Sequence, residues 1–207
     1  MKFFARSLSV LALLGVASLA NAQTLAFDHT GSDSAIGGST STVGYTFTVN
    51  SPITVTDLSV YSGFGLGSAS FPIGVWDSTN SLIATTTVTT ATPGVTYASA
   101  NGGNFIGNAI APLNLGVGNY TIGVFLGDAN DTVALFGTIL ANPSVTYGEA
   151  AIAPSAGLVQ PTTFGSGAGL FGPTFRFRGG TPVPEPGSVA LLVGAGIGGV
   201  MLRRRKK

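Results

Sequence analysis

Residue types that could perform catalysis are scarce between Gln23 and Thr181. His29 is the only histidine of the chain, and it lies in the polar segment 28–33, which reads Asp-His-Thr-Gly-Ser-Asp. A Ser-His-Asp triad would have to use this histidine, whereas a polar segment of this kind is typical of a solvated loop. The chain contains no cysteine, which excludes disulfides and thiolate zinc sites. We therefore predict that the protein is not an enzyme.

Three oxygen-bearing side chains lie close together in a predicted turn. Asp128, Asn130 and Asp131 supply carboxylate and amide oxygens within four residues, and calcium prefers such ligands. The twelve-residue spacing of an EF-hand loop is missing, and Asp and Asn are also common in hairpin turns that bind nothing. Calcium at these residues is the only cofactor that the sequence suggests. Asp28 and Asp33 form a weaker pair of the same kind.

Trp76 and Asp77 are adjacent and allow two interpretations. An indole ring beside a carboxylate could stack on a sugar and accept hydrogen bonds from its hydroxyls. Alternatively, Trp76 belongs to the core and Asp77 begins a turn. Glycosidases need two carboxyl groups roughly 5–10 Å apart. The seven acids of the body are spread over separate turns, which argues against such a site.

The charge of the folded body differs from that of the whole chain. The formal net charge is +1, but Lys2, Arg6 and the run 203–207 lie at the two ends. Between residues 23 and 181, seven acidic residues face only two arginines, so this part carries −5. An acidic segment without lysine offers no basic surface to a phosphate backbone. We expect no nucleic-acid partner.

The pattern of the body predicts an all-β domain. About 160 residues suffice for one domain with a sizeable core. Short runs of Val, Thr, Ile and Phe alternate with Gly, Pro, Asn and Ser, and Tyr45, Phe47 and Val49 alternate with threonines. This alternation is typical of strands that are half buried. We predict an antiparallel β-sandwich, jelly-roll-like, over residues 23–178.

Hairpins and loops follow from the turn residues. Asp77-Ser-Thr-Asn80 predicts a hairpin of 73–77 with 82–90, and the turn 128–131 predicts one of 120–126 with 133–139. In the last strand, 173–178, we expect Phe175 and Phe177 to point inward and Arg176 and Arg178 outward. The glycine-rich stretches 91–107 and 142–172 predict long loops.

The N-terminus has the features of a cleavable signal peptide over residues 1–22. Lys2 and Arg6 precede a short apolar run from Leu8 to Leu19, and Ala20-Asn21-Ala22 forms a small-residue cleavage site. Signal peptidase would cut after Ala22 and leave Gln23 as the first residue. The alternative is an uncleaved anchor. The prediction places the body outside the cytoplasm.

The last residues form three consecutive parts. A linker, 179–186, contains two prolines that keep it extended. An uncharged run, 187–202, is roughly 24 Å long as a helix, slightly short of the ~30 Å hydrocarbon core. Five cations follow, Arg203, Arg204, Arg205, Lys206 and Lys207. They predict a transmembrane helix that ends in the cytoplasm.

This tail resembles the PEP-CTERM sorting signal of exported Gram-negative proteins. The resemblance covers residues 183–207 and combines the box with the apolar segment and the basic end. The box consists of Val183, Pro184, Glu185, Pro186, Gly187 and Ser188. The resemblance implies cleavage by an exosortase, a membrane enzyme, and transfer of the body to the outer surface. The alternative is a plain membrane anchor.

Two functions remain open from the sequence. The first, which we favour, is a noncatalytic protein of the cell surface or extracellular matrix, sorted through its tail. The resemblance implies association with exopolysaccharide or biofilm. The second is a secreted carbohydrate-binding or carbohydrate-active protein with the same anchor.

Overall fold

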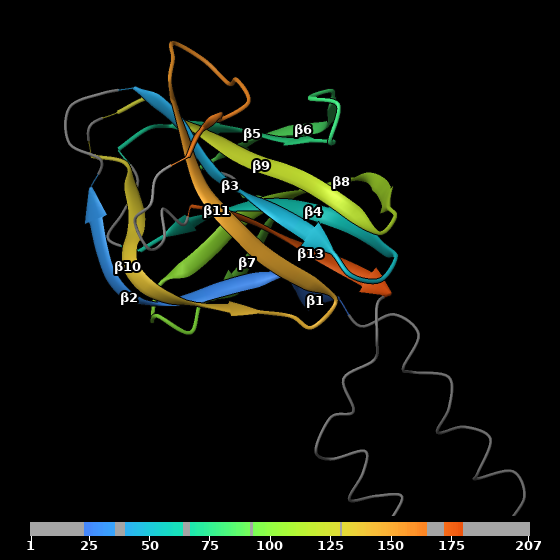
Figure 1. Cartoon of the computed structure of the whole chain (residues 1–207). Helices are drawn as coiled ribbons and strands as arrows, with labels where there is room; N and C mark the ends of the chain where they lie inside the picture. Colours follow the sequence, from blue (N-terminus) through green and yellow to red (C-terminus); the bar gives the residue numbers. More distant parts are fainter. Residues whose placement is uncertain are drawn as a thin grey trace, which may run out of the picture.

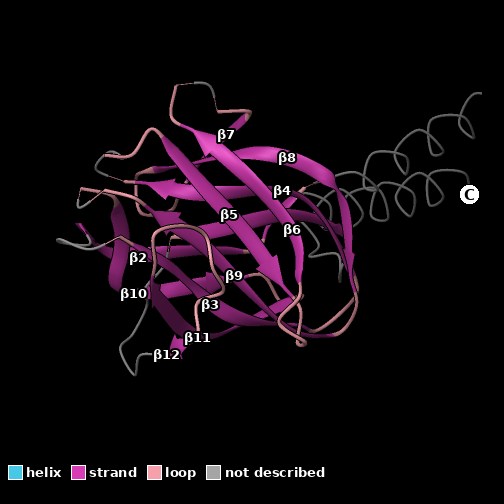
Figure 2. Ribbon diagram, turned by 90° about the horizontal axis from the view of Figure 1, so that it is seen from above, coloured by secondary structure: helices cyan, strands magenta, loops and turns pink. Residues whose placement is uncertain are grey.

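The computed structural model describes residues 23–35, 40–63, 67–91, 93–128, 130–164 and 172–179. The predicted signal peptide and the predicted membrane helix lie outside these ranges. Within them the secondary structure consists of strands, and every strand pair is antiparallel (Figures 1 and 2). The all-β prediction is thus confirmed. The part of the chain that the structure describes contains no helix long and apolar enough to cross a membrane.

Three sheets build the body, with the strands in the following spatial orders. The first sheet holds β1 (Thr24–Leu25), β13 (Pro173–Gly179), β4 (Ile53–Ser62), β8 (Asn104–Leu115) and β7 (Val95–Ala98). The second holds β12 (Thr163–Phe164), β11 (Val145–Pro154), β3 (Ser41–Val49), β9 (Gly118–Leu126), β5 (Ser70–Trp76) and β6 (Leu82–Thr89). A separate ribbon pairs β10 (Thr132–Ala141) with β2 (Phe27–Ala35).

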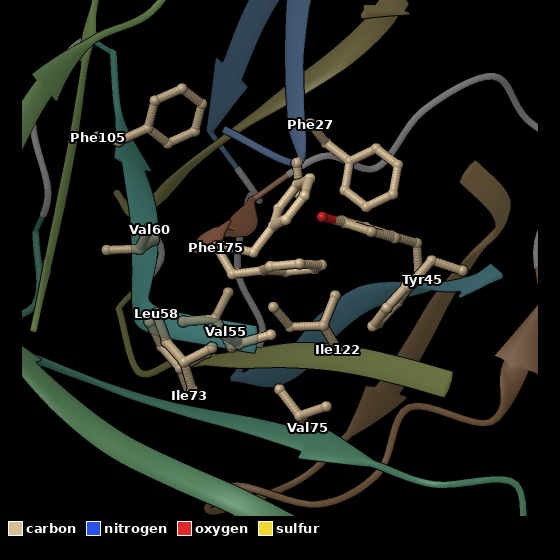
Figure 3. Close-up of a cluster of buried hydrophobic side chains, with 14 of the residues drawn as sticks. Phe27, Tyr45, Val55, Leu58, Val60, Ile73, Val75, Phe105, Ile122 and Phe175 are labelled. Atoms are coloured by element: carbon tan, nitrogen blue, oxygen red, sulfur yellow. The ribbon is translucent and has the colours of Figure 1, made fainter. Parts of the chain in front are cut away.

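The two larger sheets share one hydrophobic core. Alternate residues of their strands point inward, as in Tyr45 and Phe47 on β3 and Phe175 and Phe177 on β13. Phe27 meets Tyr45 edge to face with ring centroids 5.2 Å apart, and it meets Phe175 in the same way at 6.0 Å (Figure 3). Such aromatic pairs stabilise a core beyond the area they bury. The predicted orientation of the last strand is confirmed for Phe175 and Phe177, which are buried, and for Arg178, which is exposed, whereas Arg176 is only partly exposed.

Asn108 joins the two larger sheets at an open seam. Its Nδ2 donates to the Thr87 carbonyl of β6 at 2.7 Å, and its Oδ1 accepts from the Gly94 amide at 3.0 Å. The amide side chain therefore completes hydrogen bonds that a neighbouring strand would otherwise make. The antiparallel sheets curve into a half-barrel. The finer designation as a jelly-roll-like sandwich stays a prediction.

The predicted hairpin of 120–126 with 133–139 is wrong. β9 lies between β3 and β5, whereas β10 pairs with β2. The chain changes sheets at the turn because the Asp131 carboxylate accepts hydrogen bonds from the amide and hydroxyl of Ser68, at 2.7 and 2.6 Å. This contact draws the turn toward the segment that precedes β5. The other predicted hairpin, β5 with β6, is confirmed.

The predicted long loops contain strands. The stretch 91–107 includes β7 and the start of β8, and the stretch 142–172 includes β11 and β12. Glycine within these stretches marks close backbone approach: a side chain at Gly107 would collide with Ser59, and one at Gly148 with Thr46. The glycines therefore fit a paired sheet as well as a loop.

Burial of tyrosines predicts an alkaline limit to stability. Burial raises the pKa of Tyr45, and it also raises the pKa of Tyr97 and of Tyr147. In the unfolded chain a tyrosine has a pKa of about 10, so it loses its proton at a lower pH there than in the folded protein. The folded state is therefore fully favoured below about pH 10 and loses stability as the pH rises above that value. We expect the free energy of unfolding, measured by denaturant titration, to fall above about pH 10. Tyr147→Phe should make this fall less steep. An equally steep fall in that variant would contradict the assignment.

Candidate functional site

The sorting box and the basic run lie outside the described residues, as do Ala20 and Ala22. The structure does show where the body ends before the sorting box begins. β13 ends at Gly179, whose φ of 88° is a conformation that favours glycine. This strand lies between β1 and β4 in the first sheet. The tail therefore follows directly from a strand that is bonded on both sides.

The first mature residue predicted by the signal peptide lies beside the last strand. Gln23 donates from Nε2 to Thr56 Oγ1 at 3.0 Å. The next residue, Thr24, pairs with Phe177. The predicted N-terminus and the start of the linker thus lie at the same edge of the body. Cleavage after Ala22 itself stays a prediction.

A charged pair holds β13 against β4. Arg176 Nε lies 3.1 and 3.0 Å from the two oxygens of Asp57, which is 1% exposed. Thr56 Oγ1 donates to the same carboxylate at 3.2 Å, and the guanidinium lies 4.7 Å from the ring centroid of Tyr97. A buried carboxylate needs such partners because it has lost its water. The sequence did not indicate this pair, whose members are 119 positions apart.

A second polar cluster fastens the β2–β10 ribbon to the first sheet. Asp28 accepts from Ser99 Oγ at 2.6 Å and from the Ala100 amide at 2.8 Å. Asn101 Oδ1 accepts from the Gly31 amide at 2.9 Å. These bonds join β2 to side-chain and backbone groups of the β7–β8 connection.

His29 lies inside this cluster and not in a solvated loop. It is 0% exposed, and its ring meets Tyr61 edge to face at 4.3 Å between centroids. Its Nδ1 is 3.8 Å from Asp28 Oδ1, while the Ser99 hydroxyl donates to that same oxygen. A triad would require the serine to donate to the histidine. The expectation of a solvated histidine is therefore wrong, because the His29 ring is packed inside the body.

The three predicted calcium ligands do lie together, and internal donors contact their carboxylates. Asp128 Oδ1 accepts from the amide and the Nδ2 of Asn130, at 2.8 and 2.9 Å. Asp131 is 0% exposed and accepts from the Asp128 amide at 3.0 Å as well as from Ser68. Among the described residues there is no group of three or more His, Cys, Asp or Glu side chains arranged to hold a metal. Calcium at this turn stays a prediction.

Trp76 and Asp77 have separate structural roles. Trp76 is 5% exposed and lies over Gly74, where an added Cβ would be 2.6 Å from its ring. It pairs with Thr121, on the face opposite to the core residues Val75 and Ile122. The tryptophan is therefore buried, as one interpretation expected, but on the outer face of the second sheet.

Asp77 organises the β5–β6 turn. Its Oδ1 accepts from Thr79 Oγ1 at 2.7 Å and from the Ser81 and Thr79 amides at 3.1 and 2.8 Å. The Thr79 hydroxyl, followed by these amides, holds the pKa of Asp77 below its usual value. The interpretation as the start of a turn accounts for every contact that this carboxylate makes in the described residues.

Removal of the guanidinium should expose the role of the charged pair. In Arg176→Met the buried Asp57 carboxylate loses its partner. We expect the free energy of unfolding to fall by about 2–3 kcal/mol, less than the ~3–5 of a fully buried pair because Arg176 is partly exposed. Denaturant titration measures the change. Arg178→Met, an exposed control on the same strand, should change it by no more than about 0.5 kcal/mol. Equal effects would show that the pair contributes nothing specific.

Comparison with known proteins locates one family feature. The PEP-CTERM protein-sorting motif matches residues 182–206. Neither the curated proteins nor the solved structures provide a match to the chain. The motif implies an exported, membrane-associated precursor that an exosortase processes for sorting to the cell surface. The predicted box and nearly all of the basic run fall inside the match, so the chain carries a PEP-CTERM protein-sorting motif after a body built from antiparallel β-sheets.

Proposed function

We propose that this chain is a noncatalytic protein of the cell surface or extracellular matrix, released there by an exosortase and associated with exopolysaccharide. The observation that carries the proposal is the sorting motif at residues 182–206, which begins three residues after β13 ends. A folded β-domain joined to such a signal is suited to display outside the cell. The signal peptide and the membrane helix belong to the same proposal.

The state of the acidic groups supports a noncatalytic role. Asp57 is paired with Arg176, Asp131 is bonded to Ser68, and Asp28 accepts from Ser99. Each carboxylate is thereby used to join two segments of the body. General acid–base catalysis needs a carboxyl group within reach of substrate.

Uncharged polar side chains support contact with polysaccharide. Amides and threonines pair across neighbouring strands: Thr48 with Asn119 at 2.8 Å, and Thr54 with Asn114 at 2.8 Å. Exposed amides and hydroxyls offer hydrogen bonds to sugar hydroxyls without repelling a charged polymer. The second candidate, a carbohydrate-active protein, would reveal itself by new reducing ends when the purified body is incubated with the host polysaccharide.

Cell fractionation tests the proposal. Pro184→Ala, Glu185→Ala and Pro186→Ala are combined in one variant, and Thr181→Ala, one residue before the matched motif, serves as control. In the native host, wild type and control should begin at Gln23, lack Arg203–Lys207 by intact mass, and leave the inner membrane. The triple variant should keep the basic run and stay there. If wild type also retains the run in the inner membrane, the chain is a plain anchored protein.

A further inference from the structure

One end of the body, here called the exit end, gathers the point where the tail begins and three connections between strands. Gly179 pairs with Ile53 at the start of β4, and Ile53 pairs in turn with Leu115 at the end of β8. The exit end thus consists of Gly179 and the turns 50–52, 116–117 and 142–144. These elements lie together at the right in Figure 1.

The linker between the body and the predicted membrane helix is too short for the body to place its opposite end on the membrane. Seven residues, 180–186, separate Gly179 from the predicted membrane helix, and they span at most roughly 25 Å when fully extended. β4 contains 10 residues and is therefore about 33 Å long. The opposite end of the body lies about this far from Gly179. An anchored chain therefore cannot place the opposite end of its body against the membrane.

The exit end carries the most exposed of the large hydrophobic residues in the described part of the chain. Val117 is 67% exposed, against 50% for Leu82. It forms the tip of the β8–β9 turn beside Gly116, where an added side chain would meet open space. Asn114 and Asn119 lie on the two strands that this turn connects, and Thr48 is bonded to Asn119; none of the three carries a charge. An apolar tip with an uncharged surround is inexpensive to bring to a lipid surface.

The charges of the body favour the same orientation. Asp28, Asp128 and Asp131 belong to segments at the end opposite to Gly179, since Leu126 pairs with Ser41 and Ser62 with Asn104 there. Near the exit end, the exposed Arg178 and Asp77 of the β5–β6 turn carry opposite charges that balance. A surface of anionic lipid repels the acidic end more than the neutral one.

We propose that the exit end docks on the phospholipid surface while the tail anchors the precursor, with Val117 as its apolar contact among the headgroups. This inference rests on the proposed membrane anchoring of the tail. The docked end holds the linker at the membrane surface, where a membrane-embedded enzyme would meet the Pro-Glu-Pro box.

Site-specific fluorescence tests the docking. Because the chain contains no cysteine, an introduced cysteine is the only residue that a thiol-linked fluorophore can label. Full-length Val117→Cys and Ala91→Cys each receive the same thiol-linked fluorophore. Ala91 is exposed and follows β6 at the opposite end, where Thr89 pairs with Ser70. Both proteins are reconstituted into vesicles of phosphatidylethanolamine and phosphatidylglycerol with headgroup spin-labelled lipid. We expect the spin-labelled lipid to quench the fluorophore at position 117 and to leave the fluorophore at position 91 unquenched.

Flotation of the same vesicles separates the possible failures. Protein that floats with the vesicles but keeps full fluorescence at 117 overturns the docking and leaves the anchor intact. Equal loss at both positions overturns it too, because the body would then have no preferred end. Protein that does not float refutes the anchor, and the docking with it. If position 117 is bright in vesicles but shielded from a soluble thiol reagent in native membranes, its partner is a protein and not lipid.

Discussion

The structure depends on the insertion of its last strand between two others. β13 pairs with β4 on one side and with β1 on the other, and its Phe175 and Phe177 are buried in the shared core. The first sheet is therefore incomplete until residues 173–179 are in place. The sorting motif begins three positions after β13 ends. The body can therefore complete its fold only when the chain up to the sorting motif is present.

Polar side chains join several elements in addition to the backbone pairing of the strands. Asp57 with Arg176, Asp131 with Ser68, and Asn108 with Thr87 each connect segments that are distant in sequence. Without disulfides, a secreted domain of this size must rely on such bonds and on packing. The cost of leaving a buried carboxylate without its donors keeps the Asp57 and Asp131 connections in place.

Local patterns could be predicted from the sequence, whereas pairings over long distances could not. The alternation in Tyr45–Val49 and Phe175–Arg178 shows directly which face each strand buries, and the Asp77 turn predicts its own hairpin. The separation of β9 from β10 depends on Asp131 meeting Ser68, 63 positions away. The residues near the turn do not predict this contact. The sorting tail can be predicted because its box, its apolar run and its cations follow one another directly in the sequence.

The central claim is that the strand before the sorting tail is an integral part of the core, and native-state hydrogen exchange tests it most directly. Amides of β13 that bond to β4 should exchange only when the whole body unfolds, with the same protection as amides in the middle of β4. The account predicts equal free energies of exchange for the two strands. It would be contradicted if β13 amides exchanged as fast as those of the exposed 116–117 turn while β4 remained protected.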